Sequence, residues 1–178
     1  MRLYVLLILL LALTGCCRDD YRFDGELDIR VVERTPGETL LNGVTDTIRG
    51  PFFYQATLNY VQLAAAPVVR PAQLLFAFSC AETYDRTLTA GSVRVTVDRS
   101  LVFDGQPYPA GGDLIELLER MPDGARRHST HGQGVTLHIE EDFLARARLP
   151  ADTYTFTFEG VLDDGTPVAQ STAVYLDL

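Results

Sequence analysis

The sequence predicts a mainly β protein in which two sheets pack face to face. Several segments alternate strictly between apolar and polar residues, which is the pattern of strands with one buried face. Gly, Pro, Asn and Asp recur between these segments at the short intervals that turns require. Because each such strand offers one apolar face, the stable arrangement presses two faces together, and about seven strands in one sandwich are expected.

The predicted strands follow one another along the chain. Four segments alternate strictly: 26–31, 93–98, 135–140 and 154–158. Two segments are apolar enough for central positions in a sheet: 52–63 and 73–80. The last predicted strand, 171–178, is joined to the strand before it through 163–166, whose Asp-Gly step suits a tight hairpin.

One short helix interrupts the strands at residues 113–121, where apolar residues recur at helical spacing. Asp113 can cap its N-terminus, with Glu116 three residues later, and Pro122 follows its end. A helix that closes one end of the sandwich explains the apolar stripe more simply than a partner-binding groove does. Residues 143–149 fit either a strand or a further helical turn.

The N-terminus predicts export and lipid attachment. Arg2 precedes an apolar run, residues 3–13, that is too short to span a bilayer. Leu13, Thr14 and Gly15 then lead into Cys16 in the pattern of a lipobox. We therefore expect cleavage before Cys16 and acylation of that cysteine. The lipid would attach the protein to a membrane, which is thus an expected partner.

The chain is thus expected to have three parts: a signal peptide (1–15), a lipidated acidic tether (16–24) and a β-sandwich domain (25–178). The formal net charge of −9 becomes −10 when Arg2 leaves with the signal peptide. An acidic protein repels phosphate, and the Arg126–Arg127 pair is too small to offset this charge. Nucleic acid is therefore not an expected partner.

Cys17 and Cys80 are the two thiols that remain once Cys16 carries lipid. In an exported protein they can oxidise to one disulfide, which would hold the domain close to its anchor. Alternatively, Cys80 is a small buried apolar residue and Cys17 an exposed free thiol. The sequence leaves both alternatives open.

The three histidines, His128, His131 and His138, are weak candidates for a metal site. His138 lies on the polar side of its predicted strand, and the other two lie in a Gly- and Arg-rich stretch, 124–134, expected to be an exposed loop. Residues 140–142 are acidic, but consecutive carboxylates on a strand point to alternate faces and cannot converge on calcium. No metal or cofactor is expected.

The sequence contains no nucleophile elbow, phosphate-binding loop or zinc-protease motif, so no catalytic residue and no enzymatic activity are expected. Glycan binding is a further alternative, because exposed aromatic rings can form flat platforms for sugars. The chain lacks Trp, the side chain best suited to such stacking, which lowers this alternative. The aromatic candidates are Tyr21, Phe52, Phe53, Tyr54 and Tyr108.

Residues 149–156 resemble the entry to the penultimate strand of immunoglobulin-like domains, where a tyrosine near the strand start bonds back to nearby backbone. Tyr154 occupies that position, and Phe156 replaces the cysteine of the intersheet disulfide found in antibody domains. The resemblance implies a single immunoglobulin-like antiparallel β-sandwich.

Residues 16–20, Cys-Cys-Arg-Asp-Asp, resemble the surface-export signal of Bacteroidota lipoproteins, in which paired acids follow the acylated cysteine. Arg18 stands where lysine is more usual. The resemblance implies that Arg18, Asp19 and Asp20 direct the protein to the cell-surface side of the outer membrane. The alternatives are the periplasmic face, or a solvated linker without any routing role.

A wider set of segments in order resembles an uncharacterised family of Bacteroidota lipoproteins that carries a domain of unknown function: 16–17, 77–80, 103–105, 108–114 and 149–165. The resemblance implies a lipid-anchored envelope protein and supplies no catalytic residues. We expect a non-catalytic binding or structural module at the outer membrane. The alternatives are a glycan- or protein-binding accessory of an uptake system, and a fimbrial or adhesive subunit that exchanges strands and has an open sheet edge.

Overall fold

The computed structural model describes residues 18–34, 47–63 and 81–178. The chain forms two compact units, the first from Met1–Asp24 with Tyr60–Arg86 and the second from Gly25–Asn59 with Thr87–Leu178. Strands β1 (Arg18–Glu33) and β3 (Phe52–Gln62) contribute residues to both units. The strand predicted at residues 73–80 lies outside the described residues.

In the first unit, the start of β1 is paired with a neighbouring strand. Strand β4 (Ala81–Tyr84) lies parallel to it, with partners from Arg18↔Ala81 to Tyr21↔Tyr84. The chain after β3 also contributes, because the Leu63 N–H donates to the Asp20 carbonyl at 2.9 Å. The described part of the expected tether, residues 18–24, is therefore strand. The physical reason is that aromatic and charged residues alternate between Asp20 and Asp24, which is the period of a strand.

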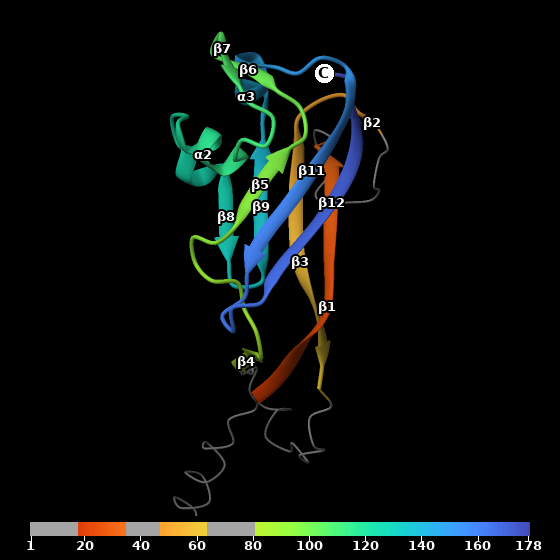
Figure 1. Ribbon diagram of the computed structural model, residues 1–178, viewed down its shortest axis with the longest axis vertical. Coiled ribbons are helices and arrows are strands. Elements are labelled where there is room, and N and C mark those ends of the chain that lie inside the picture. The colour runs from red at the N-terminus through yellow and green to blue at the C-terminus, as the bar shows by residue number, and fades with distance from the viewer. Residues whose placement is uncertain (1–17, 35–46, 64–80) are drawn as a thin grey trace, which may run out of the picture. The chain divides into compact units, whose positions relative to one another are not determined.

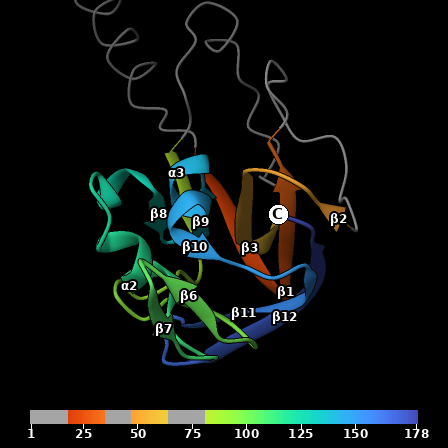
Figure 2. The same ribbon diagram turned by 90° about the horizontal axis from the view of Figure 1, so that it is seen from above.

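The second unit is a β-sandwich, which confirms the predicted mainly β fold (Figures 1 and 2). One sheet has the order β1-β3-β9-β8 within this unit, and the other has the order β2-β12-β11-β5. The strands not yet delimited are β2 (Thr47–Ile48), β5 (Arg94–Val97), β8 (His128–His131), β9 (Gly134–Ile139), β11 (Asp152–Val161) and β12 (Pro167–Leu176).

The core forms where the apolar faces of the two sheets meet. Alternate residues of β3 and of β11 are buried, as the strand period requires. Phe52 of one sheet packs edge-on against Phe156 of the other with ring centroids 6.1 Å apart, and Tyr54 lies 5.6 Å from Phe156. Burial of each such side chain contributes about 1.5–3 kcal/mol.

The β11–β12 hairpin confirms the turn predicted from the Asp-Gly step. The two strands are antiparallel partners from Asp152↔Leu176 to Val161↔Pro167. The Leu162 N–H donates to the Thr166 carbonyl at 2.9 Å, and Gly165 has a φ of 86°. Glycine suits this position because a left-handed backbone costs it nothing.

Two features add to the predicted sandwich. Strand β2 lies parallel to the end of β12, with partners Tyr175↔Thr47 and Leu176↔Ile48, so the pairing is not wholly antiparallel. A separate three-stranded sheet has the order β10-β6-β7. Its strands are β6 (Leu101–Phe103), β7 (Gln106–Tyr108) and β10 (Ala147–Arg148).

The predicted helix is present as α2 (Leu114–Glu119), and the Asp113 carboxylate accepts from the Ile115 N–H at 3.0 Å, which confirms the cap. Leu114 lines a small apolar cavity together with Phe52 and Phe156, so the helix packs on the core as expected of a closing element. The described residues also contain helix α3 (Glu141–Arg146) and the 3-10 turn η1 (Gly124–Arg126). None of the helices described is long and apolar enough to span a bilayer.

Candidate functional site

The predicted lipidation site, Cys16, lies outside the described residues. So do Cys17 and Cys80, the two cysteines of the possible disulfide. The proposed export residues Arg18, Asp19 and Asp20 lie on β1, where they face Ala81, Glu82 and Thr83 of β4 in register. They are thus part of a paired strand. The lipidation, the disulfide and the routing role stay predictions.

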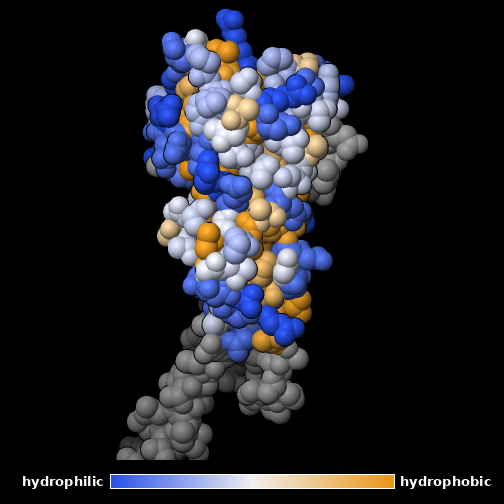
Figure 3. Space-filling model, viewed as in Figure 1, coloured by the Kyte–Doolittle hydropathy of each residue, from blue (hydrophilic) through white to orange (hydrophobic). Residues whose placement is uncertain are grey.

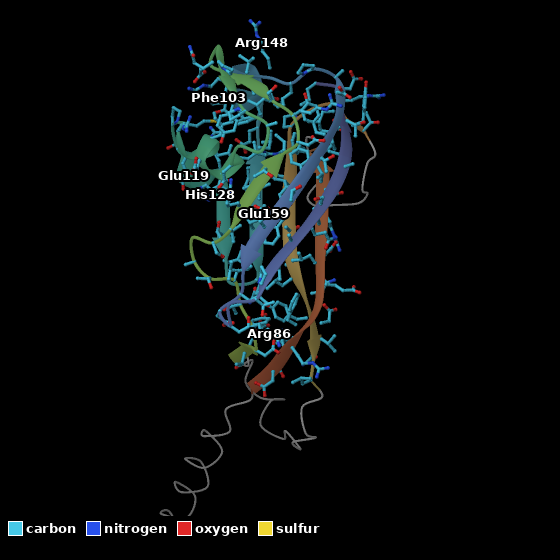
Figure 4. The ribbon with its side chains drawn as sticks, in the orientation of Figure 1. Arg86, Phe103, Glu119, His128, Arg148 and Glu159 are labelled. Atoms are coloured by element: carbon cyan, nitrogen blue, oxygen red, sulfur yellow. The ribbon has the colours of Figure 1, made fainter. Side chains whose placement is uncertain are left out.

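The histidines do not come together. His128 and His131 lie on β8, so the stretch 124–134 holds η1 and β8 where a loop was expected. His128 Nε2 lies 3.4 Å from Glu119 Oε1 (Figure 4), whereas His138 meets Phe53 edge-on with ring centroids 4.9 Å apart. Within the described ranges, no three His, Cys, Asp or Glu side chains are grouped to hold a metal ion.

The acidic run at residues 140–142 begins helix α3, which corrects the expectation that it continues a strand. Each of its outer members is paired with an arginine. Glu140 Oε1 lies 3.0 Å from Arg34 Nη1, and Asp142 Oδ1 lies 2.7 Å from Arg127 Nη1. The Arg127 guanidinium lowers the pKa of the Asp142 carboxyl through these contacts.

The aromatic residues considered for a glycan platform separate into buried and accessible ones. Phe52, Tyr54 and Tyr108 are buried, which removes these three from the glycan-platform alternative and agrees with a central strand at 52–63. Phe53 is half-buried on the outer face of its sheet, with the Arg34 guanidinium 5.9 Å from its ring centroid. Tyr21 is also half-buried and belongs to a larger group.

This group, the aromatic cluster, consists of Tyr21, Phe23, Tyr60 and Tyr84 of the first unit. Tyr21 stacks on Tyr84 with centroids 5.2 Å apart, Tyr84 meets Tyr60 edge-on at 4.7 Å, and Tyr60 lies 6.1 Å from Phe23. Of these four rings, only Tyr21 is among the aromatic candidates for a glycan platform predicted from the sequence. Tyr21 and Phe23 alternate with charged residues in the sequence, and this alternation indicates that the two rings lie on one face of a strand.

An open groove lies at one end of the second unit, with a volume of about 430 Å³. Apolar residues such as Leu144 and Leu149 line it beside two arginines, Arg49 and Arg148. Arg148 projects away from the protein (Figure 4), and Arg49 lies 3.8 Å from Asp177. No described residue presents a buried polar group that would orient a ligand there, so the groove is a weaker candidate.

The strongest candidate is the open edge of β12, defined as residues 167–174. Strand β2 pairs only with Tyr175 and Leu176. Within the described part of the chain, residues 167–174 therefore have a strand partner, β11, on one side alone. Unpaired backbone groups along a strand are a ready template for another strand.

The direction of the backbone groups follows from the hairpin. Thr155 stands opposite Ala173 in the hairpin. Both backbone groups of Thr155 point away from β12, because its N–H donates to the Asp98 carboxylate at 2.9 Å and its carbonyl accepts from the Asp98 N–H at 3.1 Å. Ala173 therefore directs its N–H and C=O away from β11. Because this direction alternates along an antiparallel strand, Ala169 and Ser171 do the same.

The composition of β12 leaves this edge unprotected. Its ten residues, Pro167–Leu176, include no charged side chain, and the three residues that offer their backbone are small. Acidic residues flank the strand, with Asp163 and Asp164 before it and Asp177 after it. On the face shown in Figure 3, hydrophobic residues are interspersed with hydrophilic ones.

No family model, no curated protein and no solved structure matches this chain.

Proposed function

We propose that this protein is a non-catalytic, lipid-anchored protein of the outer membrane whose β-sandwich binds an extended segment of a partner protein along the open edge of β12. The anchor is supported by the lipobox that ends at Cys16. The binding role is supported by one observation: residues 167–174 have uncharged side chains and, among the described residues, a strand partner only on the β11 side.

Strand addition suits this edge for an energetic reason. Ala169, Ser171 and Ala173 each offer a backbone donor and a backbone acceptor to an incoming strand. Each hydrogen bond contributes a net stabilisation of about 0.5–1.5 kcal/mol, and their fixed spacing sets the register. Edge strands that avoid pairing usually carry charged residues, bulges or central prolines. Strand β12 has no charged residue, and its one proline, Pro167, lies at the first position, where it leaves the rest of the edge able to pair.

The charges around the edge define the partner's chemistry. Asp163 and Asp164 lie at one end of β12 and Asp177 at the other, so an incoming strand with basic flanking residues is favoured. Two copies of this chain would bring acidic ends together, and the formal net charge of each copy, −9 for the full sequence, becomes −10 when Arg2 leaves with the signal peptide. A different protein is therefore favoured over strand exchange between copies, which is what a fimbrial subunit requires.

The binding test uses two synthetic peptides with the same alternating Thr-Val centre, one flanked by Arg pairs and the other by Glu pairs. We expect the Arg-flanked peptide to slow hydrogen exchange at the amides of Ala169, Ser171 and Ala173, measured residue by residue by NMR. The amides of Gln170 and Thr172, which face β11, serve as internal references. Slow exchange at the three edge amides in the free monomer, or no change with either peptide, would show that the edge is not a binding site.

Variants with charge at the edge extend this test. Replacing Ala169 and Ala173 by Lys places charges on the edge strand and should abolish peptide protection. The matched control is the Gln55→Lys, Thr57→Lys pair on β3, which adds the same charge to a strand that lies between β1 and β9 in the other sheet. If the wild-type chain dimerises in sedimentation experiments and the Lys pair on β12 abolishes the dimer, the partner is a second copy and the heterologous proposal fails.

The anchor is tested separately. Wild-type protein should incorporate an alkyne fatty acid in cells, and Cys16→Ser should not. Labelling that persists in Cys16→Ser would refute the anchor. Protease treatment of intact cells tests the orientation, because cleavage supports a cell-surface location, whereas protection beside a cleaved surface control supports the periplasmic face.

A further inference from the structure

We infer that the aromatic cluster of the first unit, Tyr21, Phe23, Tyr60 and Tyr84, seats this unit in the headgroup region of the membrane that holds the lipid anchor. The inference rests on the proposed acylation of Cys16. It assigns the cluster a partner of defined chemistry, a zwitterionic bilayer surface.

The cluster is accessible and amphipathic. All four residues are half-buried, so each ring keeps part of its surface in contact with solvent. The polar ends of two rings are satisfied within the unit, because the Tyr60 hydroxyl donates to the Arg86 carbonyl at 2.6 Å and the Tyr84 hydroxyl donates to Glu82 Oε2 at 2.6 Å. The bond to Glu82 raises the pKa of Tyr84 to about 12, so this tyrosine is neutral at physiological pH.

Chain length places the cluster near the anchor whatever path the chain takes between them. Tyr21 follows Cys16 by only five residues. A fully extended chain of that length reaches about 18 Å, which is an upper limit for the separation of the two Cα atoms. The polar headgroup region is about 5–8 Å deep on each side of a bilayer. An acylated Cys16 therefore keeps Tyr21, and the rings that contact it, close to the membrane surface.

Aromatic rings with one polar end are the side chains that proteins concentrate at the boundary between lipid and water. The charges around the cluster favour a zwitterionic surface over an anionic one, because the described residues of the first unit include five acidic residues and three arginines. The contact should therefore depend on ring burial and should persist when salt screens the charges.

The absence of tryptophan from the chain allows a direct test. Tyr84→Trp introduces the sole indole of the protein, and the full acylated chain is inserted into phosphatidylcholine and phosphatidylethanolamine vesicles with and without brominated acyl chains. We expect blue-shifted emission and loss of intensity with the brominated lipids, both unchanged in high salt. Phe23→Trp provides a second probe in case the first variant disturbs the stacked rings.

Two matched controls define the signal. Phe158→Trp places the indole at a position that is 0 % exposed in the core of the second unit, so its emission should not respond to brominated lipid. Tyr84→Trp combined with Cys16→Ser lacks the anchor and should lose the quenching.

The outcomes separate this inference from the proposed anchor. Fatty-acid labelling together with unquenched emission from both Tyr84→Trp and Phe23→Trp overturns the inference and leaves the anchor intact. Absence of labelling refutes the anchor and the inference with it. A saturable emission change on adding soluble dextran, without any response to brominated lipid, identifies the cluster as a glycan platform and also overturns the inference.

Discussion

The hydroxyl of Tyr154 donates a hydrogen bond to the carbonyl oxygen of Pro150 at 2.9 Å, which ties the start of β11 to the chain just before it. This is the backbone contact expected from the resemblance of residues 149–156 to an immunoglobulin-like strand entry. Tyr54 in the same core differs, because its buried hydroxyl has no hydrogen-bond partner among the described residues. Burial accordingly raises the pKa of Tyr54 well above its usual value.

The two tyrosines make a matched pair for mutation. Tyr154→Phe removes a made hydrogen bond and should lower the free energy of unfolding by about 1 kcal/mol in urea denaturation. Tyr54→Phe removes an unsatisfied buried hydroxyl and should leave that free energy unchanged or raise it. An equal decrease in the free energy of unfolding for both variants would show that the packing around the rings, and not the hydrogen bond of Tyr154, determines the effect of removing a hydroxyl.

The cap of α2 should be important for stability. The Asp113 carboxylate accepts from the Ile115 N–H at 3.0 Å and from the Val95 N–H at 3.3 Å, which joins the helix to β5. Asp113→Ala should reduce the free energy of unfolding by about 1–2 kcal/mol, whereas Asp113→Asn keeps an accepting oxygen and should lose less. The free energy of unfolding is measured by thermal and by urea denaturation. An equal decrease for both variants would mean that the negative charge of Asp113, which both variants lose, contributes more than its capping hydrogen bond.

Gly134 should tolerate no side chain. A Cβ at this position would lie 2.2 Å from the Ala56 carbonyl oxygen and 3.0 Å from the Thr57 Cα, both backbone atoms of β3. Gly134→Ala should therefore cost about 1–3 kcal/mol through displacement of the strands. Gly50→Ala is the control, because within 4 Å its Cβ would meet only the far end of the Glu33 side chain, at 3.3 Å, and no backbone atom. Equal urea midpoints for the two variants would contradict this prediction.

Stability should depend on pH through His138. Burial lowers the pKa of His138, and the nearby Arg34 acts in the same direction, while Glu140 opposes them. The unfolded chain therefore binds a proton more readily than the folded chain near the ordinary histidine pKa of about 6.5. The free energy of unfolding should be largest above that pH and should fall as the pH drops below it.

The measurement is urea denaturation of wild-type protein and His138→Gln at pH values from 5 to 8. The variant should show a smaller decrease on acidification than the wild type. Identical slopes would mean that other groups account for the pH dependence.

The sequence predicted strands best where alternation is long and strict. A half-buried strand imprints its period on the sequence, and the predicted segment 154–158 lies within β11, while the predicted segment 135–140 matches β9 except for Glu140, which precedes helix α3. Strands β6, β7 and β10 have only two or three residues each, which is too short for any period to show. The start of β1 was missed because the acidic character of residues 19–20 outweighed the alternation that follows them.

The open edge could not be predicted in the same way. The lack of charge in Pro167–Leu176 is visible in the sequence, but its meaning depends on the order of the strands in the sheet. That order is set by pairing between distant segments, such as β12 with β2, and no local pattern encodes it. The accessible rings of Tyr60 and Tyr84 were missed for the same reason, since each comes from a different strand.

The late position of β12 in the chain has a consequence for the timing of folding. Val174 and Leu176 are buried, and β12 separates β2 from β11 in its sheet. The sheet β2-β12-β11-β5 therefore cannot be completed over the core until residues 167–176 have been synthesised, so β11 waits for its hairpin partner while β2, made long before, waits for both.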